Sequence, residues 1–89
     1  MMYPFLKLPD NTEIVHSEML DGGRVKVYIE KPVLGGFHTA TCFLPDYEWQ
    51  DVSGFTDDEM SRLREIVESE SHLIMRFSTE GGFANASGF

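Results

Sequence analysis

The chain has 89 residues, of which 42% are hydrophobic and 12% aromatic, and it carries a formal net charge of −8 at pH 7. This length suits one domain with a thin core, and this composition excludes the low-hydrophobicity profile of disordered chains. The single cysteine, Cys42, excludes an intramolecular disulfide and favours a reducing cytoplasm. No signal-peptide pattern opens the chain and no apolar run reaches the ~20 residues of a membrane helix, so we expect a cytoplasmic protein without a membrane partner.

Four runs in the first half alternate apolar and polar residues, which predicts antiparallel strands at residues 3–8, 12–20, 24–31 and 37–44. In the third run, Val25, Val27 and Ile29 point to one side. We expect Pro32 to end that strand, because proline cannot donate to a ladder. Glycine pairs follow the second and third runs and provide turns, so consecutive strands should form a meander.

After Phe55, the spacing of the apolar residues changes from that of a strand to that of a helix. Thr56 and Glu59 form a capping-box pair, which predicts a helix at residues 56–68. Its apolar stripe consists of Met60, Leu63, Ile66 and Val67. Residues 69–80 fit a second helix that starts at Ser69, or a strand, with the helix favoured. The tail, residues 82–89, is expected to be flexible or pinned by its two phenylalanines.

These elements predict one α+β domain over residues 1–89, with the order ββββα and a possible second helix. A four-stranded antiparallel sheet should be packed by one or two C-terminal helices. This size and order are common among small accessory proteins of bacteria and their mobile elements, which is an analogy of fold alone.

No catalytic, metal-binding or cofactor-binding motif is present in the sequence, so we expect a protein that is not an enzyme and holds no metal or cofactor. The three histidines do not stand at a short metal-ligand spacing from one another. His38 and Cys42 are four residues apart, but on a strand they lie about 13 Å apart and cannot share one metal directly. Cys42 is expected to be a small buried thiol, since it lies between Ala40 and Leu44 on one face of a strand.

Charge is unevenly spread along the chain, and the acidic second half contains large aromatic side chains. Residues 1–44 hold four bases and five acids, whereas residues 45–89 hold three bases and ten acids. Residues 46–55 combine acids with aromatic anchors, a composition that favours a partner-binding segment made of Asp46, Tyr47, Glu48, Trp49, Asp51 and Phe55. Alternatively, Trp49 and Phe55 fold back over the edge of the core.

A second candidate surface is the polar face of the third strand. It carries Arg24, Lys26 and Tyr28, with Lys31 just beyond, and bases beside a ring can hold single-stranded nucleic acid. The net charge disfavours this alternative, because nucleic acid is a polyanion. An ordinary solvated face is the simpler explanation.

The hypothesis that follows is a non-enzymatic interaction or regulatory module that self-associates or binds an unidentified protein through residues 46–55. Its surplus of acid would suit a basic partner, although acid also serves solubility alone. Two alternatives stay open: binding of nucleic acid through the third strand, and an acidic mimic of nucleic acid that occupies a basic protein.

Overall fold

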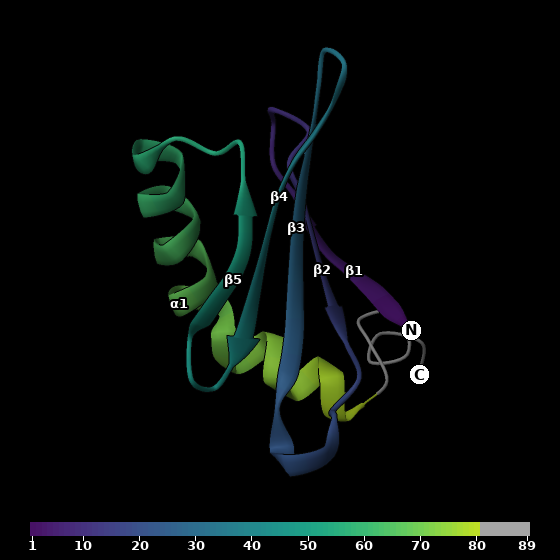
Figure 1. The fold of residues 1–89 in the computed structure, drawn as a ribbon. Coiled ribbons are helices and arrows are strands. Elements are labelled where there is room, and N and C mark those ends of the chain that lie inside the picture. Colours follow the sequence, from purple (N-terminus) through teal and green to yellow (C-terminus); the bar gives the residue numbers. More distant parts are fainter. Residues whose placement is uncertain (81–89) are drawn as a thin grey trace.

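The computed structural model describes residues 1–80, which form a five-stranded antiparallel sheet followed by one long helix (Figure 1). The elements are β1 (Met2–Lys7), β2 (Glu13–Ser17), the short 3-10 helix η1 (Asp21–Gly23), β3 (Val25–Val33), β4 (Gly36–Leu44), β5 (Glu48–Ser53) and α1 (Asp57–Thr79). Each strand pairs with the next one along the chain. The predicted α+β class and meander are therefore confirmed, whereas the predicted tail at residues 82–89 lies outside the described residues.

The sheet has five strands, so the prediction of four was wrong. β5 pairs with β4, and a register shift interrupts this pairing between Thr39 and Thr41. Asp51 lies in this irregular part of β5 with a φ of 53°, in the left-handed region that aspartate tolerates better than most residues. Because the irregularity breaks the alternation of a six-residue strand, the apolar pattern did not reveal β5.

β3 continues through Pro32, contrary to the expectation that this residue ends it. A two-residue loop joins β3 to β4 after Val33, which pairs with Gly36. In such a hairpin the pair next to the loop is hydrogen bonded, so alternation turns the nitrogen of Pro32 away from β4. On that side the pairing with β2 has already stopped at Glu30. The sheet therefore loses no hydrogen bond through the missing N–H of Pro32.

The two predicted helical segments form one helix. Thr56 caps the start of α1: its hydroxyl accepts from the Glu59 N–H at 3.1 Å, and its own N–H donates to the Glu59 carboxylate at 2.9 Å. Ser69 does not start a second helix, because it lies inside α1. Its hydroxyl donates to the Ile66 carbonyl at 3.1 Å. Ser71 makes the equivalent bond three residues back. Such bonds bend helices, and α1 changes direction as it passes from the side of β5 to behind the sheet (Figure 1).

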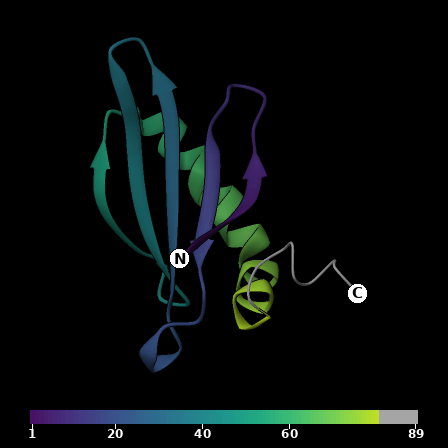
Figure 2. The same cartoon turned by 90° about the vertical axis from the view of Figure 1, so that its right-hand side faces the viewer.

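The core lies between one face of the sheet and α1. It is a single cluster of buried side chains, comprising Ile14, Val25, Val27, Ile29, Ala40, Cys42, Leu44, Met60, Leu63, Val67 and Ile74. The apolar stripe of the helix packs with Val25, Val27 and Ile29 of β3 in this cluster, where Ile66 is partly buried. In Figure 2 the helix passes behind the strands, and no helix of the described chain covers the other face of the sheet.

Candidate functional site

The face of the sheet turned away from α1, which we call the open face, has no helix of residues 1–80 packed against it, and Ser17 and Thr41 are its buried members. Strand alternation and pairing give its residues: Met2, Pro4, Lys7, Glu13, Val15, Ser17, Lys26, Tyr28, Glu30, Pro32, Phe37, Thr39, Thr41, Phe43, Glu48, Gln50 and Ser53. Its middle row crosses all five strands without a charge and consists of Pro4, Val15, Tyr28, Thr41 and Gln50. The charged residues lie in the rows toward the two ends of the strands.

Arg24 lies at the end of the open face next to η1, where two carboxylates balance its charge. Its Nη2 lies 2.7 Å from the Glu48 carboxylate, and its Nε lies 3.4 Å from that of Asp46. The same guanidinium lies over the ring of Phe43, 4.5 Å from the centroid. Lys26 in the next row is exposed and makes no ion pair within residues 1–80.

Tyr28 occupies the centre of the open face. Its hydroxyl donates to the Glu30 carboxylate at 3.2 Å. Burial, with a further contribution from Glu30, raises the pKa of Tyr28 above its ordinary value. The phenol is therefore a neutral donor at physiological pH, with a half-buried ring.

Lys31 does not lie beside Arg24, Lys26 and Tyr28 as expected. Odd-numbered residues of β3 face α1, and Lys31 shares that face with Ile29. Its ammonium lies 3.0 Å from the Glu59 carboxylate and 3.7 Å from that of Asp10. The hydrogen bond with Glu59 is the main reason that the pKa of Lys31 is raised.

The two carboxylates beside Lys31 are held in their charged forms. The backbone N–H of Thr56 is the main cause that lowers the pKa of Glu59, and Lys31 adds to it. Hydrogen bonds from Thr12 lower the pKa of Asp10, with a smaller contribution from Lys31. This cluster lines a surface hollow of about 260 Å³ between the β1–β2 turn, β3 and the start of α1.

The acidic-aromatic segment predicted to bind a partner is divided between the two sides of the sheet. Trp49 and Phe55 are partly buried against the core cluster. Tyr47 is 39% exposed, and its hydroxyl donates to Ser71 of α1 at 2.9 Å. Asp46 and Glu48 instead hold Arg24 at the edge of the open face.

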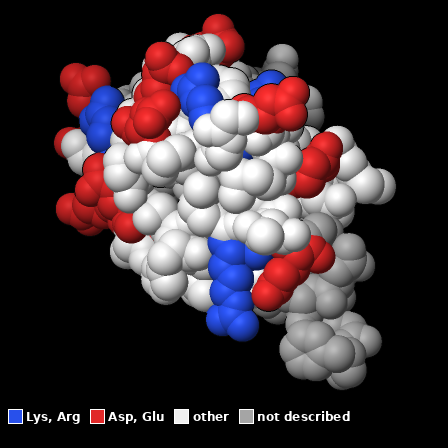
Figure 3. All heavy atoms as spheres, turned by 90° about the horizontal axis from the view of Figure 1, so that it is seen from below, with Lys and Arg blue, Asp and Glu red and all other residues white. Residues whose placement is uncertain are grey.

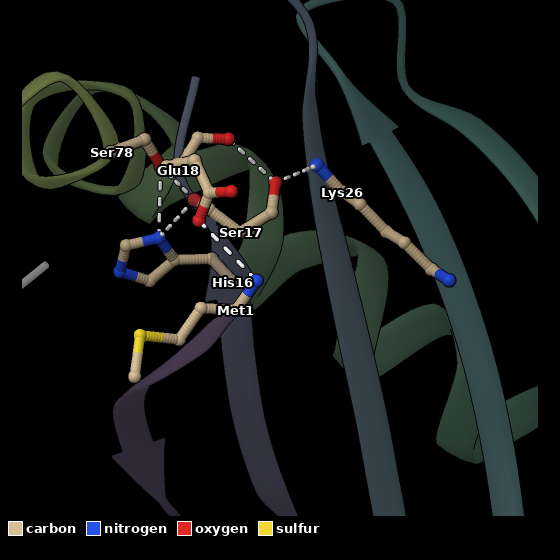
Figure 4. Close-up of polar contacts among 6 residues, drawn as sticks. All are labelled: Met1, His16, Ser17, Glu18, Lys26 and Ser78. Atoms are coloured by element: carbon tan, nitrogen blue, oxygen red, sulfur yellow. Dashed lines mark hydrogen bonds and ion pairs between the residues drawn. The ribbon is translucent and has the colours of Figure 1, made fainter. Parts of the chain in front are cut away.

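A buried polar network that the sequence analysis did not find joins β2 to the last turn of α1 (Figure 4). His16 is fully buried, and its Nδ1 lies 2.9 Å from both the Ser17 carbonyl and the Ser78 hydroxyl. Ser78 donates to the same carbonyl at 2.8 Å. Because a carbonyl only accepts, we assign the proton of His16 to Nδ1. The one available signal was a histidine at an apolar position of an alternating run, two residues after Ile14.

Replacing Ser78 with Ala should lower the free energy of unfolding by about 1–3 kcal/mol, because a buried carbonyl and a buried imidazole each lose a partner. Urea denaturation measures this loss. Ser69→Ala is the matched control, since Ser69 is exposed and bonds only within α1, and it should change stability by less than about 0.5 kcal/mol. Equal losses for the two variants would show that Ser78 does not anchor the helix.

Cys42 is a buried free thiol. Burial, with a smaller effect of Glu68, raises the pKa of the Cys42 thiol to about 11, so this group is protonated at neutral pH. Within residues 1–80, no group of three or more histidine, cysteine or acidic side chains is arranged to hold a metal ion. None of the helices in these residues combines the length and apolar character that a membrane crossing requires.

The fold and its open face define the class of this protein: a small α+β domain in which one helix covers one side of an antiparallel meander. Comparisons with protein-family models, with curated proteins and with solved structures find no match.

Proposed function

We propose that this protein is a non-enzymatic interaction module that binds a protein partner through its open face. The observation that carries the proposal is the uncharged middle row, which crosses five strands on a face that no helix of residues 1–80 covers. A sheet with apolar and aromatic side chains on a face is normally covered by a second layer. Here a partner would supply that layer.

The hairpin of β3 and β4 supports the same proposal. It extends beyond the rest of the sheet (Figure 1) and carries two strongly exposed apolar side chains. Leu34 at its tip is 106% exposed, and Phe37 is 59% exposed on the same side as the open face. An apolar surface next to polar residues is typical of sites that bind other proteins.

Nucleic acid is less well supported as the partner. Arg24 and Lys31 each contact two carboxylates, which leaves Lys26 as the only member of the predicted basic group without an ion pair in residues 1–80. On the side seen in Figure 3, the Lys and Arg side chains stand apart and each lies near an acid. A phosphate backbone binds best to a continuous basic groove.

The acidic-mimic alternative needs one continuous acidic surface. Asp46 and Glu48 lie at the start of β5, whereas Asp57, Asp58 and Glu59 follow its other end (Figure 1). A strand of six residues separates the two groups by about 20 Å. This arrangement favours the open face over the acids as the interaction surface.

Site-specific photo-crosslinking in cells that naturally make the protein tests the proposal. A benzoyl-phenylalanine in place of Phe43, a half-buried ring of the open face, should form an adduct with a protein. The same probe in place of Arg64, on the exposed side of α1, is the control and should not. Absence of an adduct at position 43, or equal adducts at both positions, would show that the open face is not the binding surface.

A further inference from the structure

On β2 and β3, the open face carries acids on one side of its middle row and a base on the other. Glu13 and Glu30 are directly opposite each other on β2 and β3, an arrangement that destabilises an isolated sheet. On β1, Lys7 is the register partner of Glu13, but no ion pair joins these two side chains in the described structure. Lys26, in the row on the other side of Tyr28, likewise has no ion pair within residues 1–80. Glu13 and Glu30 on one side of the middle row, and Lys26 on the other, therefore have no ion-pair partner within residues 1–80.

A two-fold axis relates these two sides to each other. If the axis lies in the interface and runs across the strands through the middle row, it reverses strand direction but keeps each strand over its own copy. Glu30 of one copy then faces Lys26 of the other, and Tyr28 meets its own symmetry mate. An axis along the strands would instead place Glu30 over Glu30.

We infer that the partner on the open face is a second copy of this chain, packed face to face with its strands antiparallel. This inference rests on the proposed function and names the partner. The same axis brings Phe37 of the projecting hairpin over the Arg24 end of the other copy, where it would lose its exposure. Arg24 already lies over one aromatic ring, and a second ring on its free side suits a guanidinium.

The size of the open face places the expected dimer among the small, weak interfaces. Three rows spaced by about 7 Å on five strands spaced by about 4.8 Å cover about 500 Å² per copy. This area is at the low end for specific interfaces, so the dimer should be weak, with a Kd in the micromolar range.

Sedimentation of the purified chain from about 5 to about 500 µM tests the inference, since this range brackets the expected Kd. The unmodified chain should shift from monomer to dimer. Lys26→Glu and Glu30→Lys should each weaken the dimer about tenfold, because each substitution places like charges opposite each other twice. The double variant restores opposite charges and should return to within about threefold of the original Kd.

Arg64→Glu is the matched control, because it makes the same charge change as Lys26→Glu on an exposed part of α1. It should leave the Kd unchanged. A second measurement does not depend on charge: Tyr28→Cys should be linked to its own copy by a short bismaleimide, whereas Arg64→Cys should not.

The outcomes separate the two proposals. A chain that stays monomeric at every concentration, or a dimer unaffected by the charge exchange, would overturn the inference of a second copy. If the probe at position 43 still forms an adduct with a different protein, the proposed function stands and only its partner changes. Failure of both experiments would remove both proposals.

Discussion

Ile29→Ala should lower the free energy of unfolding by about 2–5 kcal/mol, the loss expected when a buried aliphatic side chain leaves a cavity. Ile29 is fully buried on the central strand, and it belongs to the cluster that joins the sheet to α1. A small domain has only about 5–15 kcal/mol of stability, so this single change would remove a large part of it. The loss is measured by urea denaturation at constant temperature, with both variant and original chain at the same concentration.

The control for Ile29→Ala is Leu34→Ala. Leu34 lies at the tip of the hairpin and is 106% exposed, so its truncation should change stability by less than about 0.5 kcal/mol. If Ile29→Ala also cost less than 1 kcal/mol, the sheet and α1 would not share the core described above.

Gly54→Ala should lower the free energy of unfolding by about 2–4 kcal/mol, since left-handed strain adds to the cost of displacing a packed ring. Gly54 joins β5 to α1 with a φ of 92°, and a Cβ at this position would lie on the imidazole of His38. That ring packs edge-on against Phe55, 5.6 Å between centroids, and so has little freedom to move. Urea denaturation measures the loss.

Gly35→Ala separates the two contributions to the Gly54 effect. Gly35 has a similar φ of 87°, but a Cβ there would meet open space. Its substitution should therefore cost only the left-handed strain, about 1–2 kcal/mol. Equal losses at the two glycines would mean that the His38 ring does not constrain the β5–α1 joint.

The local features of the fold could be predicted because they depend on neighbours in sequence. Alternation placed Val25, Val27 and Ile29 on one side of a strand, and in the structure that side is the core, where all three are fully buried. The capping box at Thr56 and Glu59 located the start of α1 within one residue. Such signals are complete within a few residues, so no knowledge of the tertiary structure is needed to interpret them.

Features that depend on a neighbour in space were missed or left open. β5 lacks a regular alternation because of the irregularity at Asp51, and only its pairing with β4 makes it a strand. The sequence also left Trp49 and Phe55 undecided between core and surface, since the position of a ring at a sheet edge depends on what packs beside it. In the structure both rings lie against the core cluster.

The open face shows the same division between sequence and structure. The parity of β3 alone separates Lys31 from Lys26 and Tyr28, so that distinction was already present in the sequence. The sequence by itself determined the strands, the helix start and the side of β3 on which each residue lies, because these follow from the chain's own periodicity. Only the tertiary structure decided which face α1 covers, which acids balance Arg24, and that His16 meets Ser78 across 62 positions, because each requires distant segments to pack together.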